Sequence, residues 1–212
     1  MLRRRRSPPV LAEVPGSRHG RLRSLDRAQL DAFTGLLGAV GESRAVLVTG
    51  REAKSAVAVG LATVAAGSGR RAVLVECDLA RPTLAASLGL SAVPGVAEYL
   101  RCEADAPQLL QPVVLAGPAT GQASAPLVCI AAGDATSQGP TLLASESFRH
   151  MAAKLRSAYD FVVAEGPPVA DQDALIAASV QFDATVACCS GSELPQALRA
   201  HVDGLVVPAG SS

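Results

Sequence analysis

The chain has 212 residues, a formal net charge of zero and 49% hydrophobic residues. This length and apolar content favour one α/β domain with a substantial core. The balanced charge gives no field that would attract nucleic acid, and the absence of Trp, with only two Tyr and four Phe, leaves few rings on which bases could stack. Nucleic-acid binding is therefore not expected.

The first 25 residues are rich in Arg and Pro and predict a flexible or loosely docked arm, followed by one folded domain over residues 26–212. Four adjacent arginines, Arg3–Arg6, would be attracted to an anionic membrane surface; a solvated linker is the alternative. They are not followed by the apolar core of a signal peptide, and no apolar run reaches the length of a membrane span. We expect a cytoplasmic protein, with the inner face of the plasma membrane as a location that the arm would allow.

Beyond the arm, helical patterns alternate with short apolar runs. The predicted strands are 45–49, 72–76, 127–131, 161–165, 184–189 and 203–207. The predicted helices are 27–40, 53–66, 82–88, 94–101, 142–157, 171–181 and 193–200, while 105–126 is expected to be a loop or a short helix. This order indicates βαβ units, and the continuously apolar strands indicate a doubly wound α/β fold, with a mainly parallel sheet covered by helices on both faces.

The five cysteines show no C-x-x-C or Cys/His spacing of a metal site. Three of them, Cys129, Cys188 and Cys189, lie in apolar, strand-like runs. We therefore expect mostly buried, reduced thiols, as in a reducing cytoplasm.

Residues 45–60 read as a buried strand, a short loop and an apolar helix that opens with Lys54 and Ser55. This is the layout of a phosphate-binding P-loop, in which backbone N–H groups surround the phosphates, the Lys reaches the outer phosphates and the hydroxyl holds Mg²⁺. Only Gly50 precedes the Lys, and Ala53 stands where a Gly is usual. Lys54 is one of only two lysines among 19 basic residues, which makes a Lys at this position by chance a roughly one-in-a-hundred event.

Acidic residues follow two other predicted strands. Glu76, Asp78 and Arg81 follow the strand at 72–76, and Glu165 ends the strand at 161–165. Because ligands bind beyond the carboxyl ends of parallel strands, these groups should converge with Lys54 and Ser55 on one crevice. Carboxylates placed there orient Mg²⁺ and an attacking oxygen in a nucleotide site.

These segments resemble the cytoplasmic kinase domains of bacterial tyrosine kinases in capsule and exopolysaccharide synthesis, which are related to the MinD/ParA ATPases. VLVECDLARPTLAASLGL is similar to the second Walker segment of that family, and CIAAG, GPTLLASESF and YDFVVAEGPP are similar to its later segments. SPPVLAEVP in the arm resembles the linker to a membrane partner. The resemblance extends over most of the chain and implies a P-loop NTPase domain that uses ATP and Mg²⁺, with a membrane polysaccharide co-polymerase or chain-length regulator as partner.

The resemblance also carries site roles onto this sequence. Asp78 and Glu165 would be catalytic, Ser55 and Asp78 would hold Mg²⁺, and the nucleotide would contact Gly50, Arg51, Glu52, Ala53, Lys54, Ser55, Ala56, Glu76 and Arg81. The departures concern these same positions. The loop is about three residues shorter than the P-G-x-G-K-S form of the family, and Glu76 and Glu165 stand where aspartates are usual.

Two further family features are altered. The oligomerisation motif E-x-x-R-x-x-R reads Asp31, Thr34 and Leu37, which puts ring assembly in question, and the sequence ends in GLVVPAGSS rather than in a tyrosine cluster. The interpretation we place first is a degenerate tyrosine-kinase-like P-loop domain that regulates or scaffolds polysaccharide synthesis with weak or no nucleotide turnover. The alternatives are an active ATP-dependent tyrosine kinase or ATPase, and a MinD-like membrane-positioning protein that uses Arg3–Arg6.

Overall fold

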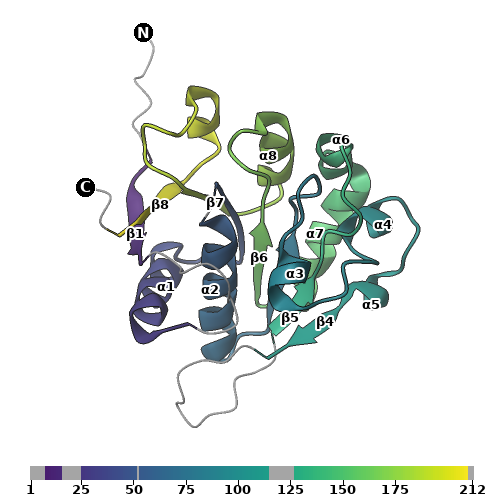
Figure 1. The fold of residues 1–212 in the computed structure, drawn as a ribbon, viewed down its shortest axis with the longest axis horizontal. Coiled ribbons are helices and arrows are strands. Elements are labelled where there is room, and N and C mark those ends of the chain that lie inside the picture. Colours follow the sequence, from purple (N-terminus) through teal and green to yellow (C-terminus); the bar gives the residue numbers. More distant parts are fainter. Residues whose placement is uncertain (1–7, 16–24, 52, 115–126, 210–212) are drawn as a thin grey trace.

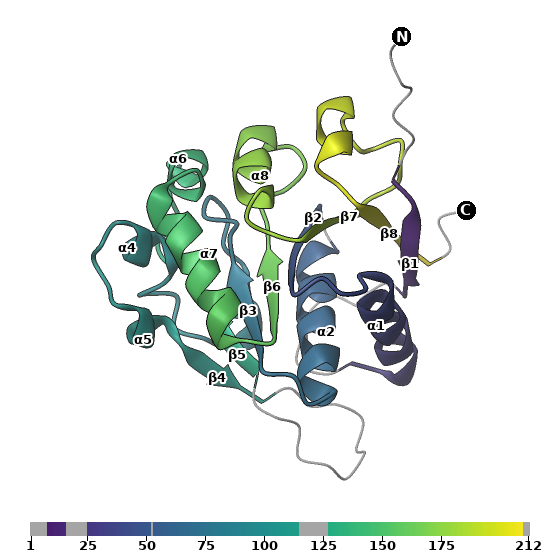
Figure 2. The same ribbon diagram turned by 180° about the vertical axis from the view of Figure 1, so that it is seen from behind.

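The computed structural model describes residues 8–15, 25–51, 53–114 and 127–209. These residues form one eight-stranded sheet in the order β1-β8-β7-β2-β6-β3-β5-β4. The pairs are parallel except for β4 with β5, which is antiparallel. The mainly parallel, doubly wound α/β sheet is thus as predicted, and Figures 1 and 2 show helices on both of its faces.

The strands are β1 (Val10–Val14), β2 (Ala45–Gly50), β3 (Ala72–Glu76), β4 (Gln111–Val113), β5 (Leu127–Ile130), β6 (Phe161–Glu165), β7 (Ala184–Cys188) and β8 (Gly204–Pro208). The helices are α1 (Arg27–Ala39), α2 (Lys54–Gly67), α3 (Leu84–Leu88), α4 (Val96–Leu100), α5 (Ala106–Leu109), α6 (Gly139–Leu143), α7 (Glu146–Ala158) and α8 (Gln172–Ser179), with a 3₁₀ helix at Gln196–Ala200. Within the described residues, no helix combines the length and the apolar character needed to cross a bilayer.

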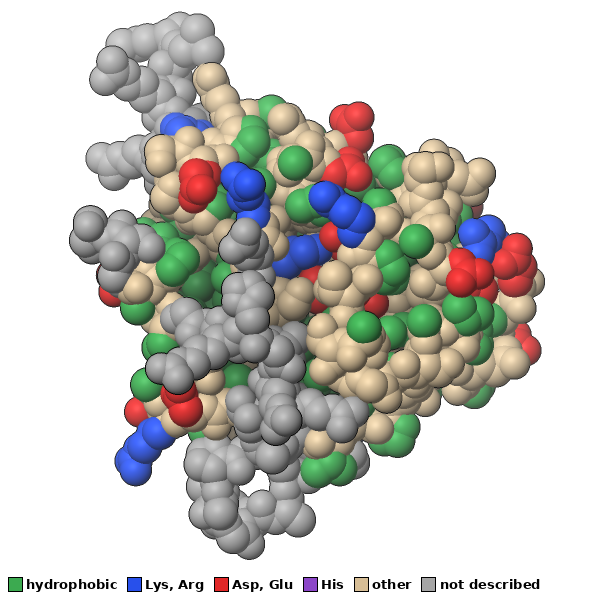
Figure 3. Space-filling view, in the orientation of Figure 1, with side chains coloured by type: hydrophobic (Ala, Val, Ile, Leu, Met, Phe, Trp, Pro, Cys, Tyr) green, Lys and Arg blue, Asp and Glu red, His purple; other side chains and the backbone are tan. Residues whose placement is uncertain are grey.

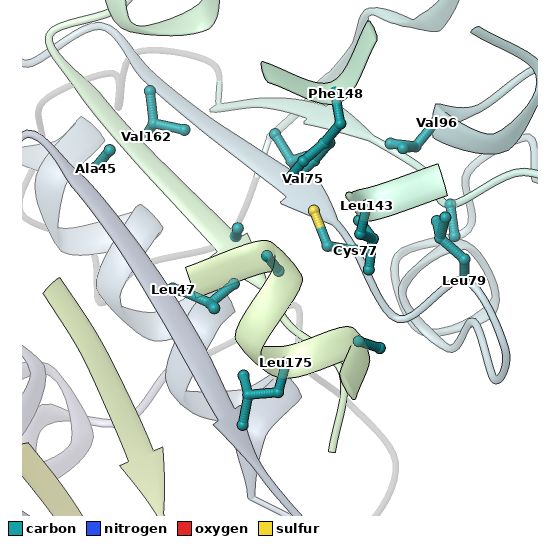
Figure 4. Packing of buried hydrophobic residues seen from close by; sticks show 14 of the residues in the cluster. Ala45, Leu47, Val75, Cys77, Leu79, Val96, Leu143, Phe148, Val162 and Leu175 are labelled. Atoms are coloured by element: carbon teal, nitrogen blue, oxygen red, sulfur yellow. The ribbon is translucent and has the colours of Figure 1, made fainter. Parts of the chain in front are cut away.

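Side chains of alternate residues in the central strands pack into two separate hydrophobic cores, one on each face of the sheet. Val46 and Val48 of β2 pack with the buried residues of α1, α2 and α3, whereas Leu47 packs with those of α4 to α8. Both sets of strand side chains are fully buried, which explains why the strand reads as an uninterrupted apolar run. Figure 4 shows the second core, where the Cys77 thiol lies among Val75, Leu143 and Phe148.

Four of the five cysteines are buried, as expected, and only Cys102 is exposed. Burial in apolar surroundings raises the pKa of the Cys129 thiol to about 12 and also raises the pKa values of Cys77 and Cys188. Thiols in such surroundings are inert packing groups rather than nucleophiles.

The predicted arm contains a strand that the sequence did not indicate. Val10–Val14 form the edge strand β1 in parallel pairing with β8, and the Leu205 N–H donates to the Pro9 carbonyl at 2.8 Å. Prolines can flank an edge strand because its outer side needs no ladder hydrogen bond. Arg3–Arg6 lie outside the described residues.

Two helical segments differ from their predicted bounds. The helix expected over 142–157 is divided into α6 and α7, because Ser145 caps α7 by accepting a hydrogen bond at its Oγ from the Phe148 N–H at 3.2 Å. The segment expected as a helix over 193–200 is a short 3₁₀ helix that begins after Pro195. The strand β4 falls in the stretch 105–126, where only a loop or short helix was predicted.

Candidate functional site: a Lys54-centred strand-end cluster

The loop between β2 and α2 is held at its start by Gly50. Gly50 has φ of +146°, and a Cβ atom there would lie 2.7 Å from both the Cβ and the carbonyl oxygen of Cys188 on the neighbouring strand. Only glycine suits this conformation and this approach. Three residues separate Gly50 from Lys54, the first residue of α2, and Ala53 at the N-cap makes no side-chain capping bond.

The Lys54 ammonium does not extend into solvent but lies against the ends of β3 and β6. Its Nζ is 2.6 Å from Asp78 Oδ2, 2.9 Å from the Gly166 carbonyl oxygen and 3.4 Å from Glu165 Oε1. Lys54 is 6% exposed. An ammonium has three N–H donors, and three protein oxygens surround this one.

Glu165, the last residue of β6, also belongs to this cluster and is fully buried. Its Oε1 accepts a hydrogen bond from Ser55 Oγ at 2.7 Å and lies 3.5 Å from Thr83 Oγ1. Its Oε2 is buried and has no hydrogen-bond partner in the part of the chain that the structure describes. Desolvation raises the pKa of this carboxyl above its ordinary value, although Lys54 and Ser55 act in the opposite direction.

Glu76, at the end of β3, is also fully buried but serves the backbone. Its Oε1 accepts hydrogen bonds from the N–H groups of Thr83 and Leu84, and its Oε2 accepts one from Ala132 at 3.2 Å. Both carboxylate oxygens are thus used to fix the start of α3 and the end of the β5 segment. Desolvation raises the pKa of Glu76, and these three N–H donors partly offset the effect.

The segment after β3 turns around Asp78. Its Oδ2 pairs with Lys54, and its Oδ1 accepts the Arg81 N–H at 3.2 Å. Asp78 is 3% exposed, whereas the Arg81 side chain is exposed. Asp78 therefore has one oxygen on the lysine and one on its own turn.

The structure brings together most of the predicted site. Lys54, Ser55, Asp78 and Glu165 are in direct contact, as expected for groups at the carboxyl ends of neighbouring parallel strands. Four other predicted residues lie outside this contact cluster: Arg51 and Arg81 are exposed, Ala56 is packed in the core, and Ala53 is the N-cap of α2. Glu52 lies outside the described residues.

Thr83 belongs to the cluster, although the sequence did not single it out. Its Oγ1 lies 3.4 Å from Ser55 Oγ, and its N–H donates to Glu76. The available signal was its place: a hydroxyl residue directly before a short helix, five residues after Asp78. Figure 3 shows acidic and basic side chains close together in the upper middle of the face it presents, in the region where β6 ends in Figure 1.

The arrangement fits a Mg²⁺–nucleotide poorly. The Ser55 hydroxyl donates to Glu165, Asp78 Oδ2 pairs with Lys54, and both oxygens of Glu76 accept from backbone N–H groups. No group of three or more His, Cys, Asp or Glu residues within the described ranges has the geometry to hold a metal ion. Mg²⁺ requires a nearly ideal octahedron of oxygen ligands. The oxygens of Ser55, Asp78 and Glu76 already have protein partners, and only the buried Glu165 Oε2 has no partner in the described part of the chain.

The parallel sheet, the strand–loop–helix with Lys54 at the helix start and the acidic strand ends define a P-loop domain. No protein-family model matches the chain. Among curated proteins, it is 27% identical over 164 residues to the tyrosine-protein kinase YwqD of Bacillus subtilis (strain 168), covering 75% of this chain and 65% of the relative. It is 28% identical over 116 residues to the tyrosine-protein kinase ptk of Acinetobacter johnsonii, covering 55% of this chain and 15% of the relative.

Solved structures show the same fold. The kinase domain of the Escherichia coli tyrosine kinase ETK matches with a TM-score of 0.78 at 17% identity, covering 97% of this chain and 92% of that one. The BceF tyrosine kinase domain matches with a TM-score of 0.75 at 21% identity, covering 95% and 93%. The Pyrococcus furiosus cell division ATPase MinD matches with a TM-score of 0.57 at 16% identity, covering 80% and 73%. The chain thus has the P-loop fold that the kinase domains of bacterial tyrosine kinases and the MinD ATPases share.

Proposed function

We propose that this chain is a degenerate P-loop domain of the tyrosine-kinase type that regulates or scaffolds capsule or exopolysaccharide synthesis, with weak or no nucleotide turnover. The observation that carries the proposal is the state of Lys54. A P-loop lysine acts on phosphates through a free ammonium, but this one is buried between Asp78, Glu165 and the Gly166 carbonyl. A nucleotide phosphate would have to displace three protein oxygens to reach it.

The loop itself gives a second argument for weak binding. Phosphate cradles depend on glycines that let the backbone approach the ligand, and only Gly50 remains here. Arg51 and Ala53 place side chains in this short connection. The surrounding fold is retained because its two cores do not depend on nucleotide chemistry.

The proposed partner is a membrane polysaccharide co-polymerase or chain-length regulator, and the proposed location is the cytoplasm next to the membrane. The named sequence relatives are tyrosine-protein kinases, and the segment around Val10–Val14 resembles the linker to such a partner. A MinD-like membrane-positioning role through Arg3–Arg6 is the alternative, and vesicle co-sedimentation that is unchanged by deleting residues 1–6 would exclude it.

One observation favours a second candidate, an active ATP-dependent kinase or ATPase. The N-terminus of the 14-residue α2 has no side-chain cap, which leaves it suited to an anion, and Lys54, Ser55, Asp78 and Glu165 are assembled beside it. If Lys54 turned toward a bound phosphate, Ser55 and Asp78 could hold Mg²⁺ and Glu165 could orient the attacking oxygen. The ion supplies charge neutralisation in such sites.

The test compares wild-type protein with Lys54→Met in an ATP hydrolysis and tyrosine-phosphorylation assay with Mg²⁺. The proposal expects both proteins to show the same background turnover. Turnover in the wild type that the substitution abolishes would overturn the proposal and support the active enzyme.

A further inference from the structure

A groove separate from the Lys54 cluster lies between α7 and the connection from α4 to α5. It has a volume of about 550 Å³, within the size range of small-molecule sites. Figures 1 and 2 both show α4, α5 and α7 side by side at the end of the molecule opposite β1 and β8. None of the residues that line it belongs to the strand-end cluster.

One wall of the groove is a polar face of α7. Ser147, His150 and Lys154 lie three and four residues apart, so they share one side of the helix, and all three line the groove. They offer a hydroxyl, an imidazole and an ammonium. Lys154 is the second of the two lysines in a chain that otherwise uses Arg for positive charge, and it is exposed.

The facing wall is formed by the chain that leaves α4. Lys154 Nζ lies 3.4 Å from the Tyr99 hydroxyl, which joins the two walls. Cys102 has φ of +61°, an uncommon conformation for a residue other than glycine, and its N–H donates to the Tyr99 carbonyl at 3.0 Å. This turn carries the exposed Asp105 to the rim of the groove.

We propose that this groove binds a small hydroxylated anion of the sugar-phosphate class. Lys154 would face the phosphate, for which an ammonium is a suitable point charge. His150 would lie beside it, with its Nε2 3.8 Å from Glu146 Oε1 on the same helix. Asp105 accepts hydrogen bonds and repels bare anions, so it favours a ligand whose hydroxyl groups can donate to it. A neutral sugar lacks the charge for Lys154, and inorganic phosphate lacks sugar hydroxyls for Asp105. The proposal does not depend on nucleotide binding at Lys54.

Cys102 provides the readout, because it lines the groove and is the one exposed cysteine of the five. The rate of its alkylation by N-ethylmaleimide is measured by mass spectrometry with increasing hexose and pentose phosphates, with glucose, and with inorganic phosphate. We expect at least one sugar phosphate to slow labelling in a saturable way, and glucose and phosphate to require about tenfold higher concentrations. The Cys102→Ser variant should not be alkylated under the same conditions, which would confirm that Cys102 is the labelled position.

Lys154→Met should weaken this protection about tenfold, the scale of one charge-assisted hydrogen bond. Arg149→Ala is the matched control, because it removes an exposed positive charge of the same helix that pairs with Glu146 and does not line the groove. Three results would overturn the proposal: no protection by any sugar phosphate up to about 10 mM, equal protection in the Lys154 and Arg149 variants, or equal protection by inorganic phosphate alone. The concentration limit corresponds to binding of less than about 3 kcal/mol.

Discussion

The ion pairs of Lys54 predict a large loss of stability when the ammonium is removed. The side chains of Lys54, Asp78 and Glu165 are 8%, 4% and 0% exposed, so Lys54→Met leaves two carboxyl groups buried without their counter-ion. Removing one partner of a buried ion pair costs about 3–5 kcal/mol. Because Glu165 can take up a proton, we expect the lower end, about 3 kcal/mol.

Urea unfolding at pH 7 and 25 °C measures this loss directly. With a urea m-value of about 2 kcal/mol/M, a 3 kcal/mol loss lowers the unfolding midpoint by about 1.5 M. Lys154→Met is the matched control, since its exposed ammonium has only the 3.4 Å contact with the Tyr99 hydroxyl, and its stability should change by less than about 0.5 kcal/mol.

A double variant separates the ion pair from the packing of the lysine stem. Adding Asp78→Asn to Lys54→Met removes one of the two uncompensated carboxyl groups, and about 1–3 kcal/mol of the free energy of unfolding should return. The reasoning fails if Lys54→Met lowers the free energy of unfolding by less than about 1 kcal/mol, or if the second substitution restores nothing.

Four further substitutions test other features. Desolvation raises the folded-state pKa of Glu165, so the wild type loses stability as pH rises through that pKa and the carboxyl ionises. Glu165→Gln has no such loss, so its free energy of unfolding relative to that of the wild type should increase between pH 5 and pH 8. An equal difference at the two pH values would contradict this. Glu76→Gln should cost about 1–3 kcal/mol in urea unfolding, because an amide cannot accept all three backbone N–H groups; a neutral result would refute that role. Gly60→Ala should lose about 1–3 kcal/mol, since its Cβ would lie 2.1 Å from the Phe33 ring, whereas Gly35→Ala, with open space around it, should gain up to about 1 kcal/mol; equal effects would be inconsistent with this packing.

The sequence was sufficient to predict the sheet and the convergence of the site, because both follow from local patterns. Continuously apolar runs such as Ala45–Gly50 mark buried parallel strands, and such strands place their carboxyl ends at one edge. The edge strand Val10–Val14 could not be predicted in this way, because its stability comes from pairing with Gly204–Pro208 at the other end of the chain.

The roles of individual acids were also beyond local patterns. Glu76 and Glu165 both end buried strands and are indistinguishable by position in the sequence. Tertiary contacts separate them: Glu76 meets the backbone of Thr83, Leu84 and Ala132, whereas Glu165 meets Lys54 and Ser55. The capture of Lys54 by protein oxygens likewise depends on side-chain directions that spacing does not encode.

The central claim is that Lys54 is engaged within the protein and is not available to a nucleotide. Calorimetric titration of the protein with ATP in the presence of Mg²⁺, beside the Lys54→Met variant, tests it most directly. We predict no saturable binding tighter than about 1 mM, and the same titration in both proteins. Saturable binding at micromolar concentrations that is lost in Lys54→Met would contradict the account.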